Sequence, residues 1–135
     1  MSGIIEFIRS LFPSKDDKRA PVRPLPSWPE IVEMMYNQPP FVSPYVDEII
    51  KVVYSADREK RYIITRNRNY GFYQFQMEQL CAWDDEEWLY ISHDPNALPA
   101  MWHSFGYSGG SFFGTEQDAW NELVSTPEYK EYFDP

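Results

Sequence analysis

The chain of 135 residues has a net charge of -9 and the length of one ordinary domain, enough to bury a core without disulfides or metal ions. Aromatic residues make up 18% of the sequence, which excludes a disordered chain despite the twelve prolines. The single cysteine, Cys81, excludes an intramolecular disulfide, and no segment resembles a secretory signal, so we expect a cytoplasmic protein. No apolar run reaches the ~18 residues that a membrane-spanning helix requires.

Charge is distributed unevenly along the chain. Residues 1–68 hold 11 Lys and Arg against 9 Asp and Glu, whereas residues 69–135 hold 1 against 12. An acidic surface repels the phosphates of nucleic acids and accelerates encounter with basic proteins. The composition therefore favours a basic protein partner and makes a nucleic acid partner unlikely.

The N-terminal segment is amphipathic. Apolar residues at helical spacing predict a short helix over residues 2–12, and the charged, proline-rich segment 13–26 predicts a semi-extended tether. We therefore expect residues 1–26 to be an appendage and residues 27–135 to form a single α+β domain. Three docking sites are open to the helix: its own domain, a protein partner, or a membrane surface that the neighbouring Lys and Arg residues would help it to contact.

The middle of the chain contains one helix followed by strands. Ser27 and Glu30 have the spacing of a capping box and predict a helix over residues 28–37. The β-branched and aromatic runs Ile49–Tyr54 and Arg61–Thr65 flank a polar loop and predict a β-hairpin.

The C-terminal half predicts more strands and then helix. Alternation from Tyr70 to Cys81 predicts a long strand, and the acidic run after it predicts a hairpin turn into a strand at Trp88–Ile91. Further strands are expected at Met101–Tyr107 and Ser111–Phe113, a capped helix after Thr115, and a final helical turn from Thr126. This order predicts an α+β fold: an antiparallel meander of four to five strands, with the N- and C-terminal helices packed on one face.

One run of residues is the candidate partner-binding site. Four consecutive carboxylates stand between two tryptophans in the sequence Trp83, Asp84, Asp85, Glu86, Glu87 and Trp88. Tryptophans anchor interfaces and carboxylates accelerate association with basic partners. Because Trp83 alternates onto the face of Cys81, it is also a candidate for the core, so the interface prediction depends mainly on the carboxylates and Trp88.

The sequence does not indicate catalysis. The two histidines, His93 and His103, lie in or next to a loop, and Ser92, His93 and Asp94 cannot converge as neighbours on an extended segment. No metal-ligand spacing occurs, and Cys81 is expected to be a buried structural thiol. We therefore predict a protein that is not an enzyme and that has no cofactor and no metal.

A short stretch resembles the RNP1 octet of RNA-recognition domains. The matching residues are Arg68, Tyr70, Gly71, Phe72 and Phe75. The glycine at the octet's second position is replaced by Asn69 and its valine by Tyr73. The preceding chain also predicts a hairpin instead of a strand, a helix and a strand. We therefore interpret this strand as core and interface.

The segments GFYQFQMEQL, WDDEEW and SGGSFFGTEQDAWNEL resemble small bacterial immunity proteins of polymorphic-toxin and contact-dependent inhibition systems. The resemblance covers residues 61–125 and implies a protein that neutralises a toxin by direct binding, without chemistry of its own. The sequence thus predicts a non-catalytic inhibitor with an acidic, aromatic surface. The alternative is an adaptor or scaffold module docked to a partner or membrane by its N-terminal helix, and the oligomeric state stays open.

Overall fold

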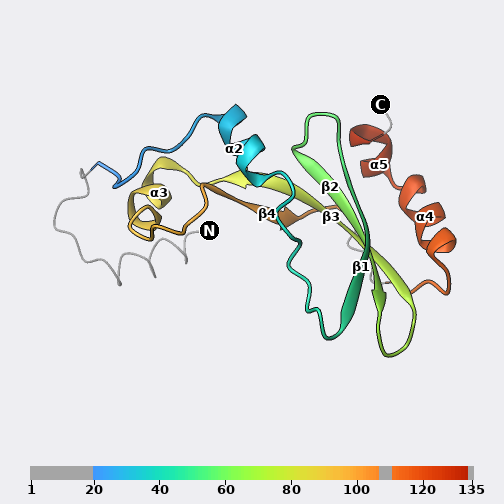
Figure 1. The fold of residues 1–135 in the computed structure, drawn as a ribbon. Helices are drawn as coiled ribbons and strands as arrows, with labels where there is room; N and C mark the ends of the chain where they lie inside the picture. The colour runs from blue at the N-terminus through green and yellow to red at the C-terminus, as the bar shows by residue number, and fades with distance from the viewer. Residues whose placement is uncertain (1–19, 107–110, 134–135) are drawn as a thin grey trace. The chain divides into compact units, whose positions relative to one another are not determined.

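The computed structural model describes residues 20–106 and 111–133 (Figure 1). The predicted amphipathic helix over residues 2–12 and the first part of the predicted tether, up to residue 19, lie outside this range. The end of the strand expected at Met101–Tyr107 also lies outside it.

The described residues contain four helices and four strands. In chain order these are α2 (Trp28–Met35), β1 (Asp47–Tyr54), β2 (Lys60–Asn67), β3 (Tyr73–Ala82), α3 (Asp85–Ile91), β4 (Ala100–Ser104), α4 (Glu116–Ser125) and α5 (Pro127–Tyr132). Among them, no helix is long and apolar enough to cross a membrane.

The strands form one antiparallel sheet in the order β1-β2-β3-β4. Tyr54 pairs with Arg61 across the first hairpin, and Lys60 pairs with Gln79 between β2 and β3. The register of β1 shifts by one residue between Ile49 and Lys51, which is a β-bulge. The structure confirms the α+β class and the strand meander.

Two local predictions were wrong. Residues Trp88–Ile91 belong to helix α3 instead of a strand. Ser111–Phe113 is not a strand, because only Phe113 pairs, in an isolated bridge with Tyr73. Pairing does not continue beyond Phe113, because the chain begins helix α4 directly afterwards. The Thr115 hydroxyl caps that helix and accepts the Asp118 N–H at 3.1 Å.

The chain divides into two compact units. Unit 1 comprises the residues up to Met35 together with Cys81–Met101, and unit 2 comprises Tyr36–Leu80 with Trp102–Pro135. The boundaries fall inside β3 and β4, so sequence order does not separate the units. The expected division at residue 26 stays a prediction.

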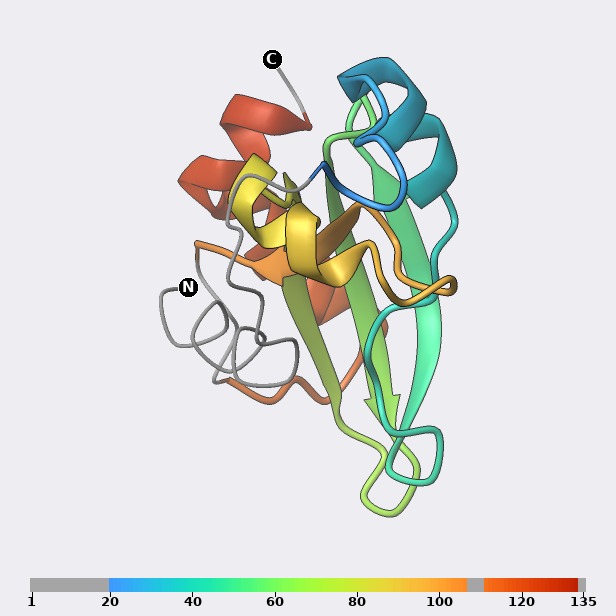
Figure 2. The same ribbon diagram turned by 90° about the vertical axis from the view of Figure 1, so that its left-hand side faces the viewer.

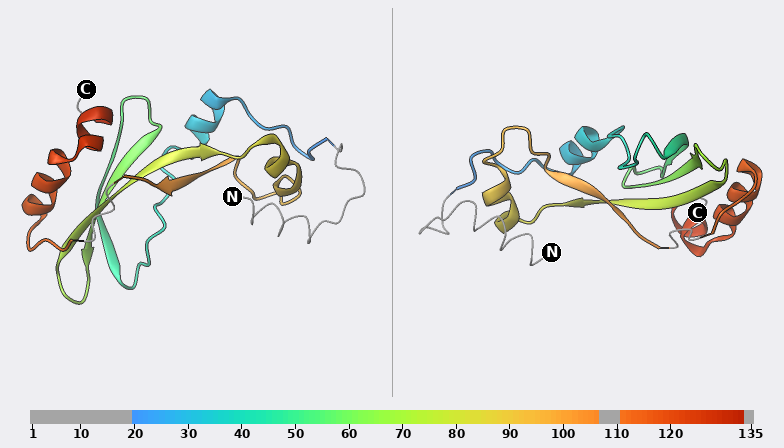
Figure 3. Two further views of the ribbon diagram at one scale, coloured as in Figure 1. Left: turned by 180° about the vertical axis from the view of Figure 1, so that it is seen from behind. Right: turned by 90° about the horizontal axis from the view of Figure 1, so that it is seen from below.

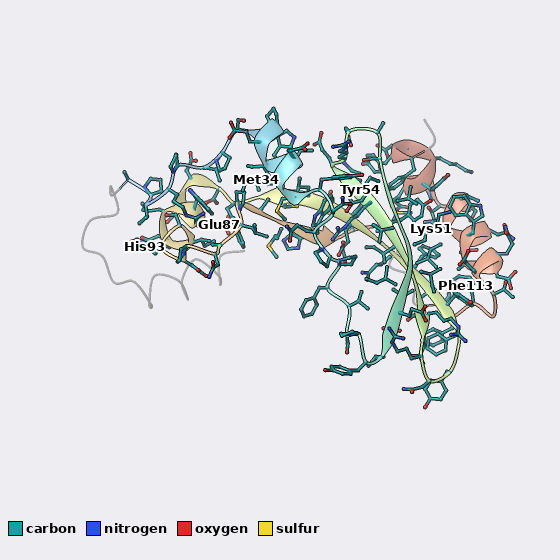
Figure 4. All side chains as sticks on the ribbon, viewed as in Figure 1. Met34, Lys51, Tyr54, Glu87, His93 and Phe113 are labelled. Atoms are coloured by element: carbon teal, nitrogen blue, oxygen red, sulfur yellow. The ribbon has the colours of Figure 1, made fainter. Side chains whose placement is uncertain are left out.

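The core of unit 2 lies between the sheet and the C-terminal helices. It is formed by Tyr62, Ile64, Phe75, Met77 and Leu123. Helices α4 and α5 lie against one face of β1 and β2 (Figure 3). Figure 4 shows Lys51 on that side, where its Nζ lies 4.7 Å from the centroid of the Trp120 ring. The C-terminal helices therefore cover this face, whereas the packing of the N- and C-terminal helices on one face stays a prediction.

The opposite face of β2 and β3 carries a buried charge. Arg61 is 1% exposed, and its Nε donates to Oε1 of Glu78 at 2.7 Å. Its Nη1 donates to the Gln38 carbonyl and to the Tyr54 hydroxyl, and its guanidinium lies 4.2 Å from the centroid of the Trp102 ring. Through Arg61 in β2, these contacts join the segment before β1 to all four strands of the sheet.

Candidate protein-binding surface

The predicted site begins helix α3. Asp84 is the N-cap residue, and its Oδ1 accepts the Glu87 N–H at 2.6 Å. The Glu87 side chain in turn accepts the Asp84 N–H at 3.2 Å, which completes a capping box. The expected hairpin turn was therefore wrong: the acidic run forms a helix N-terminus, where carboxylates are favoured by the helix dipole.

Two of the predicted contact residues are buried. Glu87 is 4% exposed and Trp88 is 2% exposed. The Trp88 indole donates to the Arg23 carbonyl at 2.6 Å, and the Arg23 guanidinium lies 5.0 Å from the centroid of the indole ring. Trp88 therefore anchors part of the predicted tether to α3, and its burial leaves little of the ring accessible to a partner; its role in partner binding stays a prediction.

The end of the predicted tether belongs to a folded unit. The Arg23 Nη2 atom donates to the carbonyls of Asp94 and Ala97, and the Val22 N–H donates to the Ser92 hydroxyl. Val22 and Arg23 of the predicted extended linker therefore hold it to α3 and to the loop that follows α3. The prolines of this segment suit an irregular packed chain, because proline has no backbone N–H that would require a hydrogen-bond acceptor.

Trp83 also contributes to folding. Its indole donates to the Leu98 carbonyl at 2.9 Å, and its backbone N–H donates to the Pro99 carbonyl. The remaining members of the predicted site, Asp84, Asp85 and Glu86, are exposed. The structure thus separates the site into buried anchors and an acidic helix start.

The described part of unit 1 is strongly acidic. Residues 20–35 and 81–101 contain seven Asp and Glu residues but only one basic residue, Arg23, which packs on Trp88. Six of these acids are exposed: Glu30, Glu33, Asp84, Asp85, Glu86 and Asp94. The negative potential of these carboxylates extends over about a Debye length from the surface.

Ser92, His93 and His103, the residues weighed above for catalysis, differ in their exposure and contacts. The Ser92 side chain is 1% exposed, and its hydroxyl donates to the Leu89 carbonyl and accepts the Val22 N–H. His93 is exposed at the end of α3, and His103 is half-buried in β4 (Figure 4). In the described ranges, no group of three or more His, Cys, Asp or Glu residues could hold a metal ion.

Cys81 differs from the sequence expectation, whereas the octet agrees with its interpretation as part of the core. Cys81 is half-buried instead of buried, and it forms no disulfide. Phe75 is 2% exposed, so its ring cannot stack on a base, whereas Tyr70 lies in the turn before β3 and is 81% exposed. The octet therefore lacks the strand platform on which RNA-recognition domains stack bases.

Exposed apolar side chains gather at one end of the sheet in unit 2. We call this surface the aromatic end. Its members are Phe41, Tyr45, Val46, Tyr70 and Phe112, with exposures of 101, 88, 43, 81 and 63%. Figures 1 and 2 show that the segment before β1 and the turn between β2 and β3 lie side by side there.

Specific contacts hold this end together. The Arg68 N–H donates to the Val46 carbonyl at 2.8 Å, and its Nε donates to the Pro44 carbonyl at 2.7 Å. Tyr70 stacks on Phe72 with a ring separation of 6.2 Å, and Phe72 contacts Phe112 at 4.2 Å. The aromatic end is thus built on a hydrogen-bonded frame although its rings face solvent.

Sequence reasoning missed this surface. Tyr70 was assigned to the long strand and to the octet, and Phe41 and Tyr45 were given no role. The available signal was the placement of large rings in loops and turns, where packing partners are scarce. Comparison with known proteins adds no relative: no family model, no curated protein and no solved structure matches the chain.

Proposed function

We propose that this protein is a non-catalytic protein-binding domain that contacts its partner through the aromatic end. The observation that carries the proposal is the exposure of Phe41, Tyr45, Tyr70 and Phe112 on one end of unit 2. Contiguous exposed apolar surface is uncommon on monomeric proteins and marks interaction sites. Tyrosine and phenylalanine rings bring large contact areas at low conformational entropy cost.

We further propose that the partner is basic. The exposed acids of unit 1, among them Asp85 and Glu86, raise the rate of encounter with a basic protein, and the aromatic rings then provide the binding energy. This division of roles suits an immunity-type inhibitor acting in the cytoplasm on a basic toxin domain. The sequence resemblance over residues 61–125 supports that finer version.

The proposal is tested with a toxin domain encoded beside the gene as the candidate partner. The Tyr70→Ser/Phe112→Ser double variant should weaken binding by about 30-fold or more, because the loss of even one buried aromatic anchor costs about 2 kcal/mol. Met34→Ser, which removes an exposed apolar side chain from α2 in unit 1, is the control and should leave the affinity unchanged. Equal affinities for all three proteins would overturn the aromatic end as the contact surface.

The acidic surface requires a separate experiment. The Asp85→Asn/Glu86→Gln double variant should slow association in low salt and leave the dissociation rate almost unchanged, since exposed charges act mainly on encounter. Stopped-flow measurement at two salt concentrations separates these rates. Association that is equally fast in wild type and variant, at both concentrations, would contradict a basic partner.

A further inference from the structure

A polar pocket opens beside the aromatic end. It has a volume of about 190 Å³ and is lined by Phe41, Val42, Ser43, Asp47, Thr65, Gln74, Phe75 and Gln76. All these residues belong to unit 2. Phe41 at its edge is fully exposed, so the pocket is continuous with the proposed contact surface.

The strand register explains why polar side chains line this pocket. Thr65 pairs directly with Gln74, and Ile63 pairs with Gln76, so Thr65, Gln74 and Gln76 project from the same face of the sheet. Asp47 pairs with Asn67, two residues beyond Thr65 on β2, and therefore shares that face. The segment before β1 closes one side, where the Asp47 N–H donates to the Ser43 carbonyl at 2.9 Å.

One atom of this lining lacks a partner. The Asp47 Oδ1 atom is buried and accepts no hydrogen bond from the described residues. Two basic residues of unit 2 that flank Asp47 in the sequence or in the sheet have other contacts. Lys51, four residues on, has its Nζ 4.7 Å from the centroid of the Trp120 ring. Arg68 donates to the Pro44 carbonyl and lies 3.9 Å from Glu48. A buried carboxylate oxygen without a donor is unfavourable, because it has lost the hydrogen bonds of water and has gained none in return.

We propose that this pocket receives a lysine or arginine side chain of the protein partner, with Asp47 as the counter-charge. A volume of 190 Å³ corresponds to about six water molecules at ~30 Å³ each, which is adequate for a flexible basic side chain. Gln74, Gln76 and Thr65 supply oxygen acceptors for the remaining N–H groups. Phe41 lies at the entrance, where an aromatic ring attracts a cation.

The inference rests on the proposed function because it deepens the description of the same surface. It is testable without the partner, by titrating the ¹⁵N-labelled full chain with n-butylammonium or n-butylguanidinium chloride. Backbone amide signals of Asp47, Thr65, Gln74 and Gln76 should shift together and saturate. Neutral 1-butanol should bind about tenfold more weakly, since it removes a charge-assisted hydrogen bond.

Matched variants identify the counter-charge. Asp47→Asn should weaken butylammonium binding by about tenfold. Glu48→Gln is the control, because it makes the same charge change at the adjacent residue, whose side chain is 44% exposed and faces Arg68; it should change binding by less than twofold. If Asp47→Asn does not fold, the wild-type comparison of butylammonium with butanol decides the question.

Two results would overturn the pocket assignment. Equal binding of butylammonium and butanol would exclude recognition of the cation, and unchanged binding in Asp47→Asn would exclude Asp47. Either result, together with weaker partner binding by the Tyr70→Ser/Phe112→Ser variant, would leave the proposed function intact. If Tyr70→Ser/Phe112→Ser keeps full partner binding and Asp47→Asn keeps full butylammonium binding, the proposed function and the pocket assignment are both rejected.

Discussion

Arg61 and Glu78 face each other across β2 and β3, with Nε and Oε1 2.7 Å apart and both side chains at most 7% exposed. The backbone pairing of the two residues holds the side chains in contact. The guanidinium also contacts the Gln38 carbonyl and the Trp102 ring, and these contacts help to replace the water that it loses on burial. One face of the sheet in unit 2 thus packs around this ion pair, and the other face packs around the hydrophobic cluster that includes Tyr62 and Phe75.

Breaking this pair should be strongly destabilising. Glu78→Ala leaves the Arg61 charge buried without its carboxylate, and we expect a loss of about 3–5 kcal/mol in the free energy of unfolding. Urea denaturation measures this loss. Glu48→Ala removes an exposed carboxylate 3.9 Å from Arg68 and should change stability by less than about 0.5 kcal/mol.

Replacing both Arg61 and Glu78 tests whether the stability loss of Glu78→Ala comes from the unpaired buried charge. The Arg61→Met/Glu78→Leu double variant should be more stable than Glu78→Ala, because it leaves no unpaired buried charge. A double variant at least as unstable as the single one would show that the Gln38 and Tyr54 contacts of Arg61 matter more than its ion pair.

Trp88 should contribute to stability instead of to partner contact. Trp88→Ala removes a side chain that is 2% exposed and bonded to the Arg23 carbonyl, and we expect a cost of about 3–5 kcal/mol. Thermal and urea unfolding measure it. Trp88→Phe keeps most of the apolar volume and should cost less. A Trp88→Ala protein of normal stability that no longer binds the partner would restore the original interface prediction.

The acidic run should divide into two structural residues, Asp84 and Glu87, and two electrostatic residues, Asp85 and Glu86. Asp84→Ala removes the N-cap of α3 and should cost about 1 kcal/mol of stability. Asp85→Asn keeps the cap and should cost less than about 0.5 kcal/mol. Circular dichroism with urea unfolding compares the two proteins. Equal stability losses would contradict the capping role of Asp84.

Unit 2 should lose stability in alkali through Tyr62. Burial raises the pKa of Tyr62 well above its ordinary value of 10.0, with a smaller contribution from Tyr129. A raised folded-state pKa means that this stability is fully present below pH 10 and is lost as pH rises above it, because the unfolded chain ionises first.

The matched control for this pH dependence is an exposed tyrosine. Tyr62→Phe should flatten the decline in unfolding free energy above pH 10, whereas Tyr45→Phe, at a position that is 88% exposed, should leave it unchanged. Urea unfolding at a series of alkaline pH values measures both. Identical pH profiles for the two variants would contradict the assignment to Tyr62.

Local sequence signals predicted most of the secondary structure. The strands β1, β2 and β3 were expected within a few residues of their observed bounds, because β-branched and aromatic runs specify extended backbone locally. Helices α2 and α4 were expected from caps at Ser27 and Thr115, and the Ser27 N–H does donate to Glu30 at 3.4 Å. The α3 error had a local signal too, since Asp84 and Glu87 have capping-box spacing.

The sequence by itself determined the α+β class, the antiparallel meander and the acidity of the C-terminal half. Only the tertiary structure decided which aromatic and charged side chains remain accessible. Phe75 is buried under α4 and α5 while Tyr70 faces solvent, and Trp88 is buried while Asp85 is exposed. Period and propensity depend on near neighbours along the chain, whereas burial depends on segments that are distant in sequence and pack over a given face. The aromatic end and the Asp47 pocket therefore became visible only in the folded chain.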